Sequence, residues 1–413
     1  MQLTDELAEI CASALSAAEF RELQRVLRDR GWITEKCHRL LQEVDELPQN
    51  HQAVADLKAE VARDAPELIA DNRLERFLLL NSASRIAHDV PQLPVAAAVK
   101  RLYRDEFGFF AAPGPEFLGM FAVRQYRFAE MCKVATLRRF PAGQLHWEIS
   151  GVVRSSLRHV SPLELPKVLE FVARRLKGFR PCFRSHLNGR RKNPLLMVEA
   201  AQNLAYYRMA KSMELQPEIL GYVINSWFHS PATLKVSPHL EWLNSVFLEN
   251  GGLIVDMGAE SPDCGVFAGN AERRKLWEEG KFQPRAAMVI WPRREMLAWA
   301  ARHPELEEEP LTAKVVSVNR TQEPRAPEGH QADEAKAMIG FLRSTVLRNA
   351  KADVGMDTPL MSSGLVDSFA VIEVLHELER VTNRRISPAE VAPAELDSVA
   401  KMLRTAERFE LRQ

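Results

Sequence analysis

Residues 253–291, LIVDMGAESPDCGVFAGNAERRKLWEEGKFQPRAAMVIW, contain the clearest fold signal in this chain. The runs Leu253–Met257 and Ala286–Trp291 are short, apolar and rich in β-branched residues, which is typical of buried strands. Between them, Asn270–Glu279 has a helical pattern that Asn270 can cap and that ends at Gly280. Strands and helices therefore alternate here, which predicts an α+β or mixed α/β fold.

Upstream of this stretch, the chain first continues the alternation and then becomes helical. Three further helices are predicted in the middle of the chain, at Leu163–Leu176, Leu195–Met213 and Leu240–Leu248. A β-hairpin is predicted from Lys133–Phe140 and Leu145–Val153, with its turn at Pro141–Gly143. Residues 1–132 show one helical pattern after another, with breaks at Pro48, Pro91, Pro94 and Pro115. We therefore expect a helical subdomain, 1–132, packed on a mixed α/β catalytic domain, 133–302.

Downstream of it, residues 303–332 combine several prolines with many charges and few large apolar residues, which predicts a linker. Residues 333–413 then form a small separate module. Its first helix is predicted at Asp333–Asn349, and a second apolar helix follows Asp367-Ser368-Phe369.

This C-terminal module resembles the acyl and peptidyl carrier proteins. Asp357-Thr-Pro-Leu-Met-Ser-Ser-Gly-Leu-Val-Asp367-Ser368-Phe369 is similar to the loop and modification site of that family, and Ile386-Ser-Pro-Ala-Glu and Pro393-Ala-Glu-Leu-Asp-Ser-Val to its later turn and last helix. The resemblance implies a small four-helix domain over about 80 residues. It also implies that Ser368 carries 4′-phosphopantetheine, whose phosphodiester would lie at a helix N-terminus. The alternative is that Asp367 and Ser368 only cap a helix.

If Ser368 carries this arm, the arm holds an acyl or aminoacyl group as a thioester. The expected partners are a phosphopantetheinyl transferase, a separate acyl- or aminoacyl-activating ligase, and a small-molecule acyl acceptor. Phe369, where many carriers have Leu, is similar to aminoacyl carriers.

The composition restricts the class of protein. Among 413 residues, 55 Lys and Arg balance 55 Asp and Glu, which argues against a nucleic-acid binder that works through bulk positive charge. A hydrophobic fraction of 46% with 27% charged residues is that of a globular protein. No signal peptide or membrane span is evident, and the cysteines, Cys11, Cys37, Cys132, Cys182 and Cys264, are scattered. We expect a soluble, cytoplasmic protein with reduced thiols.

Two groups of polar residues in 133–302 are catalytic candidates. His146 and Glu148 alternate on one predicted strand and so share a face, which suits a base and its orienting partner, or two metal ligands. The alternative is a hairpin whose solvent-exposed face carries these polar residues. His229 lies with His186 and His239 at the ends of predicted elements, where catalytic residues gather, although single histidines are more often structural.

Cys264 follows the strand 253–257, where a strand-to-helix turn can expose a nucleophile. The alternative is a small buried thiol. Glu35 and His38 have the Glu-x-x-His spacing of di-iron helices, but no second copy of that motif is present.

A basic run between residues 167 and 192 is a candidate surface for docking the carrier. Its arginines are Arg174, Arg175, Arg180, Arg184, Arg190 and Arg191. The helix after Ser368 carries Glu373, Glu377 and Glu379, so the two segments have complementary charges. The alternative is a solvated charged face.

The strand–helix–strand order of 253–291 also resembles the closing segment of GNAT acyltransferases. That family has a phosphate-binding loop after a strand, and Arg175-Leu-Lys-Gly178-Phe-Arg180 is its nearest match here, with Arg180 in place of a small residue. No nucleotide-binding P-loop, dinucleotide fingerprint or zinc-protease motif is present.

These observations predict a biosynthetic enzyme of specialised metabolism fused to its own carrier, most simply an acyl or aminoacyl transferase. The alternatives are a metal-dependent oxidase that modifies the tethered group, and a non-catalytic scaffold that presents the carrier to separate enzymes.

Overall fold

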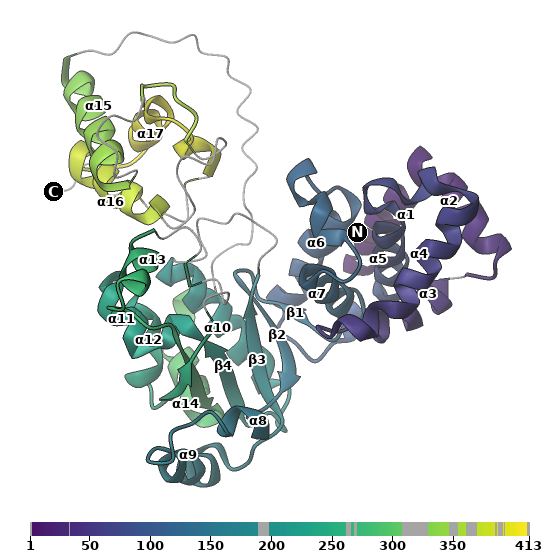
Figure 1. Ribbon diagram of the computed structural model, residues 1–413, viewed down its shortest axis with the longest axis horizontal. Coiled ribbons are helices and arrows are strands. Elements are labelled where there is room, and N and C mark those ends of the chain that lie inside the picture. The colour runs from purple at the N-terminus through teal and green to yellow at the C-terminus, as the bar shows by residue number, and fades with distance from the viewer. Residues whose placement is uncertain are drawn as a thin grey trace.

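The computed structural model describes residues 2–32, 34–188, 198–261, 266–267, 271–307, 329–346, 354–360, 370–384, 386, 391 and 393–410. Within these ranges, no helix has both the length and the apolar character needed to cross a lipid bilayer. The chain combines many helices with one six-stranded mixed sheet, which agrees with the predicted α+β class (Figure 1).

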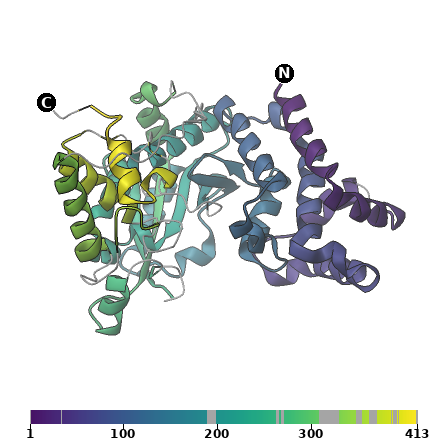
Figure 2. The same ribbon diagram turned by 90° about the horizontal axis from the view of Figure 1, so that it is seen from above.

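Successive helices fill the N-terminal third, as predicted. They are α1 Leu3–Leu15, α2 Ala18–Asp29, α3 Thr34–Gln42, α4 Gln52–Asp64, α5 Arg73–Ile86, α6 Ala97–Ala111 and α7 Tyr126–Ala135. Pro48, Pro91 and Pro115 lie in the first turns of short 3₁₀ helices between them, where a missing N–H costs nothing. α5 is buried along most of its length, and α1, α3, α6 and α7 contact it. Figure 2 shows this helical region beside the sheet-containing region.

The predicted first strand of the hairpin is wrong over most of its length. Helix α7 continues to Ala135, and the backbone then turns at Leu137, which has a positive φ of 57°. Only Phe140–Pro141 is extended, as β1. Lys133 and its helical neighbours are buried, so tertiary packing decides their conformation against a strand-like pattern. The turn itself is confirmed at Gly143, whose φ of +103° favours glycine.

The strands are β1 Phe140–Pro141, β2 Leu145–Ser150, β3 Cys182–Leu187, β4 Gly221–Ser226, β5 Leu253–Ala259 and β6 Arg285–Pro292, in the order β1-β2-β3-β4-β6-β5. β5 and β6 confirm the two runs in the opening stretch. Of the paired strands, β3 and β4 are parallel, and the other neighbours are antiparallel.

Helices cover both faces of this sheet. The helices of this region are α8 Arg154–Leu157, α9 Leu165–Phe171, α10 Glu199–Glu214, α11 Pro231–Val236, α12 Trp242–Leu248, α13 Ala271–Glu278 and α14 Arg293–Ala301. One face forms an aromatic core with α10, α12 and α14, built around Trp147, Phe183, Tyr222 and Trp291. The other face is aliphatic and packs against α8 and α9. The helices predicted at 163–176, 195–213, 240–248 and 270–279 are thus confirmed with shifted ends.

The C-terminal helices form a third, separate core. α15 Gly329–Phe341, α16 Ala370–Thr382 and α17 Val399–Ala406 bury Met338, Leu378, Met402 and their neighbours together. α15 begins four residues before the expected module boundary at 333. Asp367 and Ser368 lie outside the described residues.

Candidate functional site

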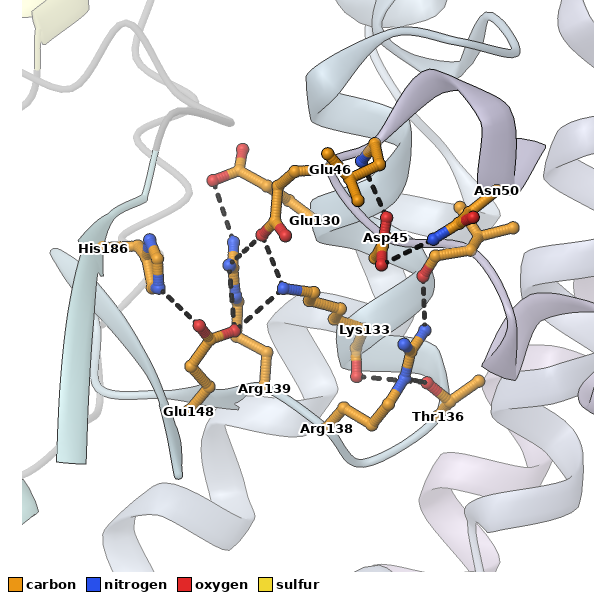
Figure 3. A network of polar contacts seen from close by, with 12 residues as sticks. Asp45, Glu46, Asn50, Glu130, Lys133, Thr136, Arg138, Arg139, Glu148 and His186 are labelled. Carbon is orange, nitrogen blue, oxygen red and sulfur yellow. Dashed lines mark hydrogen bonds and ion pairs between the residues drawn. The ribbon is translucent and has the colours of Figure 1, made fainter. Parts of the chain in front are cut away.

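A buried network of charged side chains joins the helical region to β2 and β3 (Figure 3). The guanidinium of Arg139, which is 0% exposed, contacts Glu46, Glu130 and Glu148 at 3.0, 3.0 and 3.3 Å. Lys133 on α7 contacts Glu46 at 2.5 Å and Glu148 at 3.0 Å. The two cations thus tie a carboxylate of the helical region to a carboxylate of the sheet.

His186 on β3 completes the network at the sheet. Its Nε2 lies 3.2 Å from Glu148 Oε1. Burial raises the pKa of Glu148, but His186, Lys133 and Arg139 outweigh it and hold this pKa well below its usual value. Burial also lowers the pKa of His186, and the hydrogen bond with Glu148, which raises it, does not fully offset this. A neutral imidazole therefore faces a charged carboxylate. The two cations therefore stabilise Glu148 in its charged form.

His146 lies on the same face of β2 as Glu148 but has a different partner. Its Nε2 is 3.2 Å from Oε1 of Glu106 on α6, and both side chains are almost fully buried. The adjoining cavity has a volume of about 10 Å³, room for about one water molecule. The prediction that His146 and Glu148 share one face of the strand is confirmed. The alternative, that this face is exposed to solvent, is wrong. His146 and Glu148 each hold the helical region to the sheet, and no described contact joins them to one another.

The β3–β4 pair is interrupted near the centre of the sheet. Its register covers Phe183–Tyr222 and Arg184–Val223 only. Beyond these pairs, β3 continues to Leu187 along β2, and β4 continues to Ser226 along β6. Within the described residues, 185–187 and 224–226 have no ladder partner on the edges that face each other. We call this interruption the fork.

His229 lies directly after the fork, in the 3₁₀ turn Trp227–His229 that follows β4. Its ring is 3% exposed, and Nδ1 lies 2.8 Å from Oδ1 of Asn244 on α12. Asn244 Nδ2 donates to the His229 carbonyl at 3.1 Å. Because this second bond fixes the amide orientation, Oδ1 is the acceptor and His229 Nδ1 carries the proton.

This tautomer leaves the Nε2 lone pair of His229 available as a base. Burial lowers the pKa of His229 to about 4, so the ring is neutral near pH 7. No described residue forms a hydrogen bond with Nε2. An imidazole that is neutral, oriented through one nitrogen and unpaired at the other has the arrangement of a general base.

Aromatic rings connect His229 to the core beneath the fork. Its ring meets Phe247 edge-on, with centroids 5.5 Å apart. Phe247 stacks on Tyr222 of β4 at 5.8 Å and 11°. His229 is therefore linked through Phe247 to Tyr222, a β4 residue that is still paired with β3.

Some predicted candidates lie outside the described residues, namely Cys264, Arg190 and Arg191. The backbone of His239 lies in the 3₁₀ turn Pro238–Leu240, and its side chain is not among those described. Cys11, Cys37, Cys132 and Cys182 are buried free thiols.

The described arginines of the basic run do not surround His229. Arg174 and Arg175 line a groove of about 370 Å³ with Pro217, Ile219 and Arg294, and Arg180 is exposed before β3. This groove precedes the first residue of β4, whereas His229 follows its last, so roughly 20 Å of strand separates them. Figure 1 shows α9 below the sheet, whereas α11 and α12 lie beside it. Only Arg184, half-buried on β3, lies at the fork.

The segment 175–180, the nearest match to a GNAT phosphate loop, also differs from that pattern in its position. It follows the helical turn Val172–Leu176 and leads into β3, whereas the GNAT pattern places such a loop after a strand. In the described part of the chain, no group of three or more His, Cys, Asp or Glu side chains is arranged to hold a metal ion.

Several residues of this site carry no signal that sequence reasoning detected. Asn244 lies 15 residues after its partner His229, within an ordinary helical pattern. Tyr222 and Ser185 lie on strands that were not predicted. Their only sequence signals were short apolar runs interrupted by polar residues.

In comparisons with known proteins, no family model, no curated protein and no solved structure matches the chain.

Proposed function

We propose that residues 133–302 transfer an acyl or aminoacyl group held as a thioester on 4′-phosphopantetheine at Ser368, with His229 as the general base. The observation that carries the proposal is the neutral, Asn244-oriented imidazole at the end of the fork. The carrier-like sequence around Ser368 supplies the acyl donor of the proposal. An acyl group held there as a thioester is already activated for transfer.

The fork suits the arm by its hydrogen-bonding capacity. Strand edges at 185–187 and 224–226 present backbone N–H and C=O groups without ladder partners in the described chain. An extended ligand with amide groups can pair with such edges as an added strand does. The phosphopantetheine arm contains two amides, so it can lie along the fork with its thioester toward His229.

The reaction then requires one proton acceptor. Nε2 of His229 takes the proton from an acceptor amine or hydroxyl as that group attacks the thioester carbonyl. The carbon–sulfur bond breaks, the new amide or ester leaves, and the arm thiolate takes the proton from the imidazolium. Atoms and charge balance without a further reactant.

The connection between the two parts allows this encounter. The 21 residues 308–328 join Glu307 to α15 and can extend to roughly 70 Å. Tethering converts the encounter into an intramolecular one at high effective concentration. The partners of this proposal are a phosphopantetheinyl transferase, an activating ligase in trans and a small-molecule acceptor.

The test begins with Ser368. Incubation with coenzyme A and a phosphopantetheinyl transferase should add the mass of one arm to the wild-type protein and nothing to Ser368→Ala. An unchanged wild-type mass, or a gain that survives Ser368→Ala, would refute the carrier assignment. With an acetyl-loaded arm and a panel of amine acceptors, His229→Ala should slow loss of the acetyl group at least 100-fold.

A further inference from the structure

Three buried hydroxyl groups form a chain beneath the fork. Oγ of Ser185 on β3 lies 2.6 Å from the hydroxyl oxygen of Tyr222 on β4. Tyr206 on α10 forms a hydrogen bond to the same Tyr222 oxygen. The exposed fractions of Ser185, Tyr222 and Tyr206 are 3%, 0% and 2%, so water does not compete for these bonds.

The chain holds more hydrogens than its own bonds can use. Three hydroxyls bring three hydrogens, and the chain has two links. With Tyr206 donating to Tyr222, the Tyr222 hydrogen can be donated to Ser185. In that arrangement the Ser185 hydrogen is available to an acceptor outside the chain. One of the three hydrogens has no acceptor within the chain in any arrangement, and a buried donor without an acceptor is costly, so the place of the chain in the fold needs an explanation.

That place is the fork. Ser185 directly follows Arg184, the last β3 residue in the ladder with β4. On its other side, Ser185 is the register partner of Trp147 on β2, so the two side chains share one face of the sheet. Trp147 is 0% exposed, and its Nε1–H has no hydrogen-bond partner in the described part of the chain. The hydroxyl chain and the unpartnered Trp147 N–H thus lie on neighbouring strands at one point.

We propose that the Ser185 hydroxyl is a catalytic hydrogen-bond donor to the carbonyl oxygen of the thioester lying in the fork, backed by Tyr222 and Tyr206. This inference rests on the proposed function. The ligand class is an uncharged acyl carbonyl, because Ser185 and the nearby Trp147 supply donors without a positive charge. Hydrogen bonds in such a chain polarise one another, which strengthens the terminal donor.

The donor acts on the charge that develops during transfer. Attack on the thioester carbon moves an electron pair onto the carbonyl oxygen, and the Ser185 O–H donates to that oxyanion without giving up its proton. When the carbon–sulfur bond breaks, the carbonyl re-forms and the hydrogen bond weakens. His229 carries out both proton transfers.

Kinetics on acetyl-loaded protein give the first test. Ser185→Ala should lower kcat by about 100- to 1,000-fold at an unchanged KM for the acceptor, the loss typical of one oxyanion donor. Tyr222→Phe should give a smaller loss, because Ser185 remains but is no longer polarised. Tyr103→Phe is the matched control, since its buried hydroxyl lies on α6, 3.5 Å from the Arg139 carbonyl. Its rate should equal the wild-type rate.

Infrared spectroscopy gives a readout that needs no turnover. With a ¹³C-labelled acetyl group on the arm, the carbonyl stretch should lie at lower frequency in the wild type than in Ser185→Ala. Equal frequencies and equal kcat in these two proteins would overturn the role of Ser185. If the carbonyl band differs between the wild type and Ser185→Ala while His229→Ala transfers the acetyl group as fast as the wild type, that result would support Ser185 as the donor. The same result would refute the proposed function with His229 as its base.

Discussion

Nδ1 of His229 donates to Oδ1 of Asn244 across 2.8 Å, and the Asn244 amide in turn donates to the carbonyl of His229. This reciprocal pair sets both the tautomer and the direction of the imidazole. The base proposed for the acyl transfer is therefore positioned by a residue that does not need to touch the substrate.

Asn244→Asp should raise the pKa of His229 above its value of about 4, because a carboxylate stabilises the imidazolium that the amide does not. Asn244→Ala should leave Nδ1 without an acceptor and destabilise the fold by about 1–3 kcal/mol. An NMR titration of the His229 ring measures the first effect and denaturant unfolding the second. An identical His229 pKa in wild type and Asn244→Asp would rule out the pairing.

The buried His229 should make the protein less stable in mild acid. Its pKa is lower in the native state, about 4, than in the unfolded chain, near 6.5. Its contribution is therefore complete above pH 6.5 and is lost as the pH falls to about 4, by about 3 kcal/mol. The free energy of unfolding of His229→Gln should fall less steeply over this interval. Parallel pH profiles would show that folding does not lower the pKa of His229.

Arg139 should be essential for the union of the helical region with the sheet. Arg139→Met leaves Glu46, Glu130 and Glu148 with one cation fewer in a buried site, which typically costs about 3–5 kcal/mol. Arg25→Met is the control, because Arg25 pairs with Glu22 on the surface, where solvent screens the pair, and its loss should matter far less. Urea unfolding of both variants makes the comparison, and equal losses would contradict the structural role.

Two glycines give opposite predictions. A Cβ at Gly151 would lie 2.2 Å from the Phe179 carbonyl oxygen, so Gly151→Ala should destabilise the β2–β3 end of the sheet by about 1–3 kcal/mol or more. At Gly108, inside α6, nothing lies within 4 Å of the added atom, so Gly108→Ala should stabilise by about 0.5–1 kcal/mol. Thermal unfolding should move the two midpoints in opposite directions.

Local patterns predicted the helices of residues 1–132 and the strands β5 and β6, because their apolar spacing and breakers agree with their environment. The strands β3 and β4 were not predicted, because Arg184, Ser185 and Asn225 interrupt their apolar pattern. The order of the sheet follows from pairings distant in sequence, which no local window contains.

The candidate site could be predicted only in part for the same reason. The sequence pointed to His229 only because it is a histidine at the end of a predicted element. Its relation to Asn244, and the chain from Ser185 to Tyr206, depend on the fold. His146 and Glu148 looked catalytic because the sequence gives no sign that α6 and α7 cover their strand with Glu106 and Lys133.

The most direct test of the central claim follows the group on Ser368 by intact-protein mass spectrometry. Acetyl-loaded wild-type protein and acetyl-loaded His229→Ala are each incubated with the panel of amine acceptors. The account predicts that the acetyl mass leaves the wild-type arm, with formation of the acetylated amine, and remains on His229→Ala. Equal rates of loss from the two proteins, with no acetylated amine in either, would contradict it.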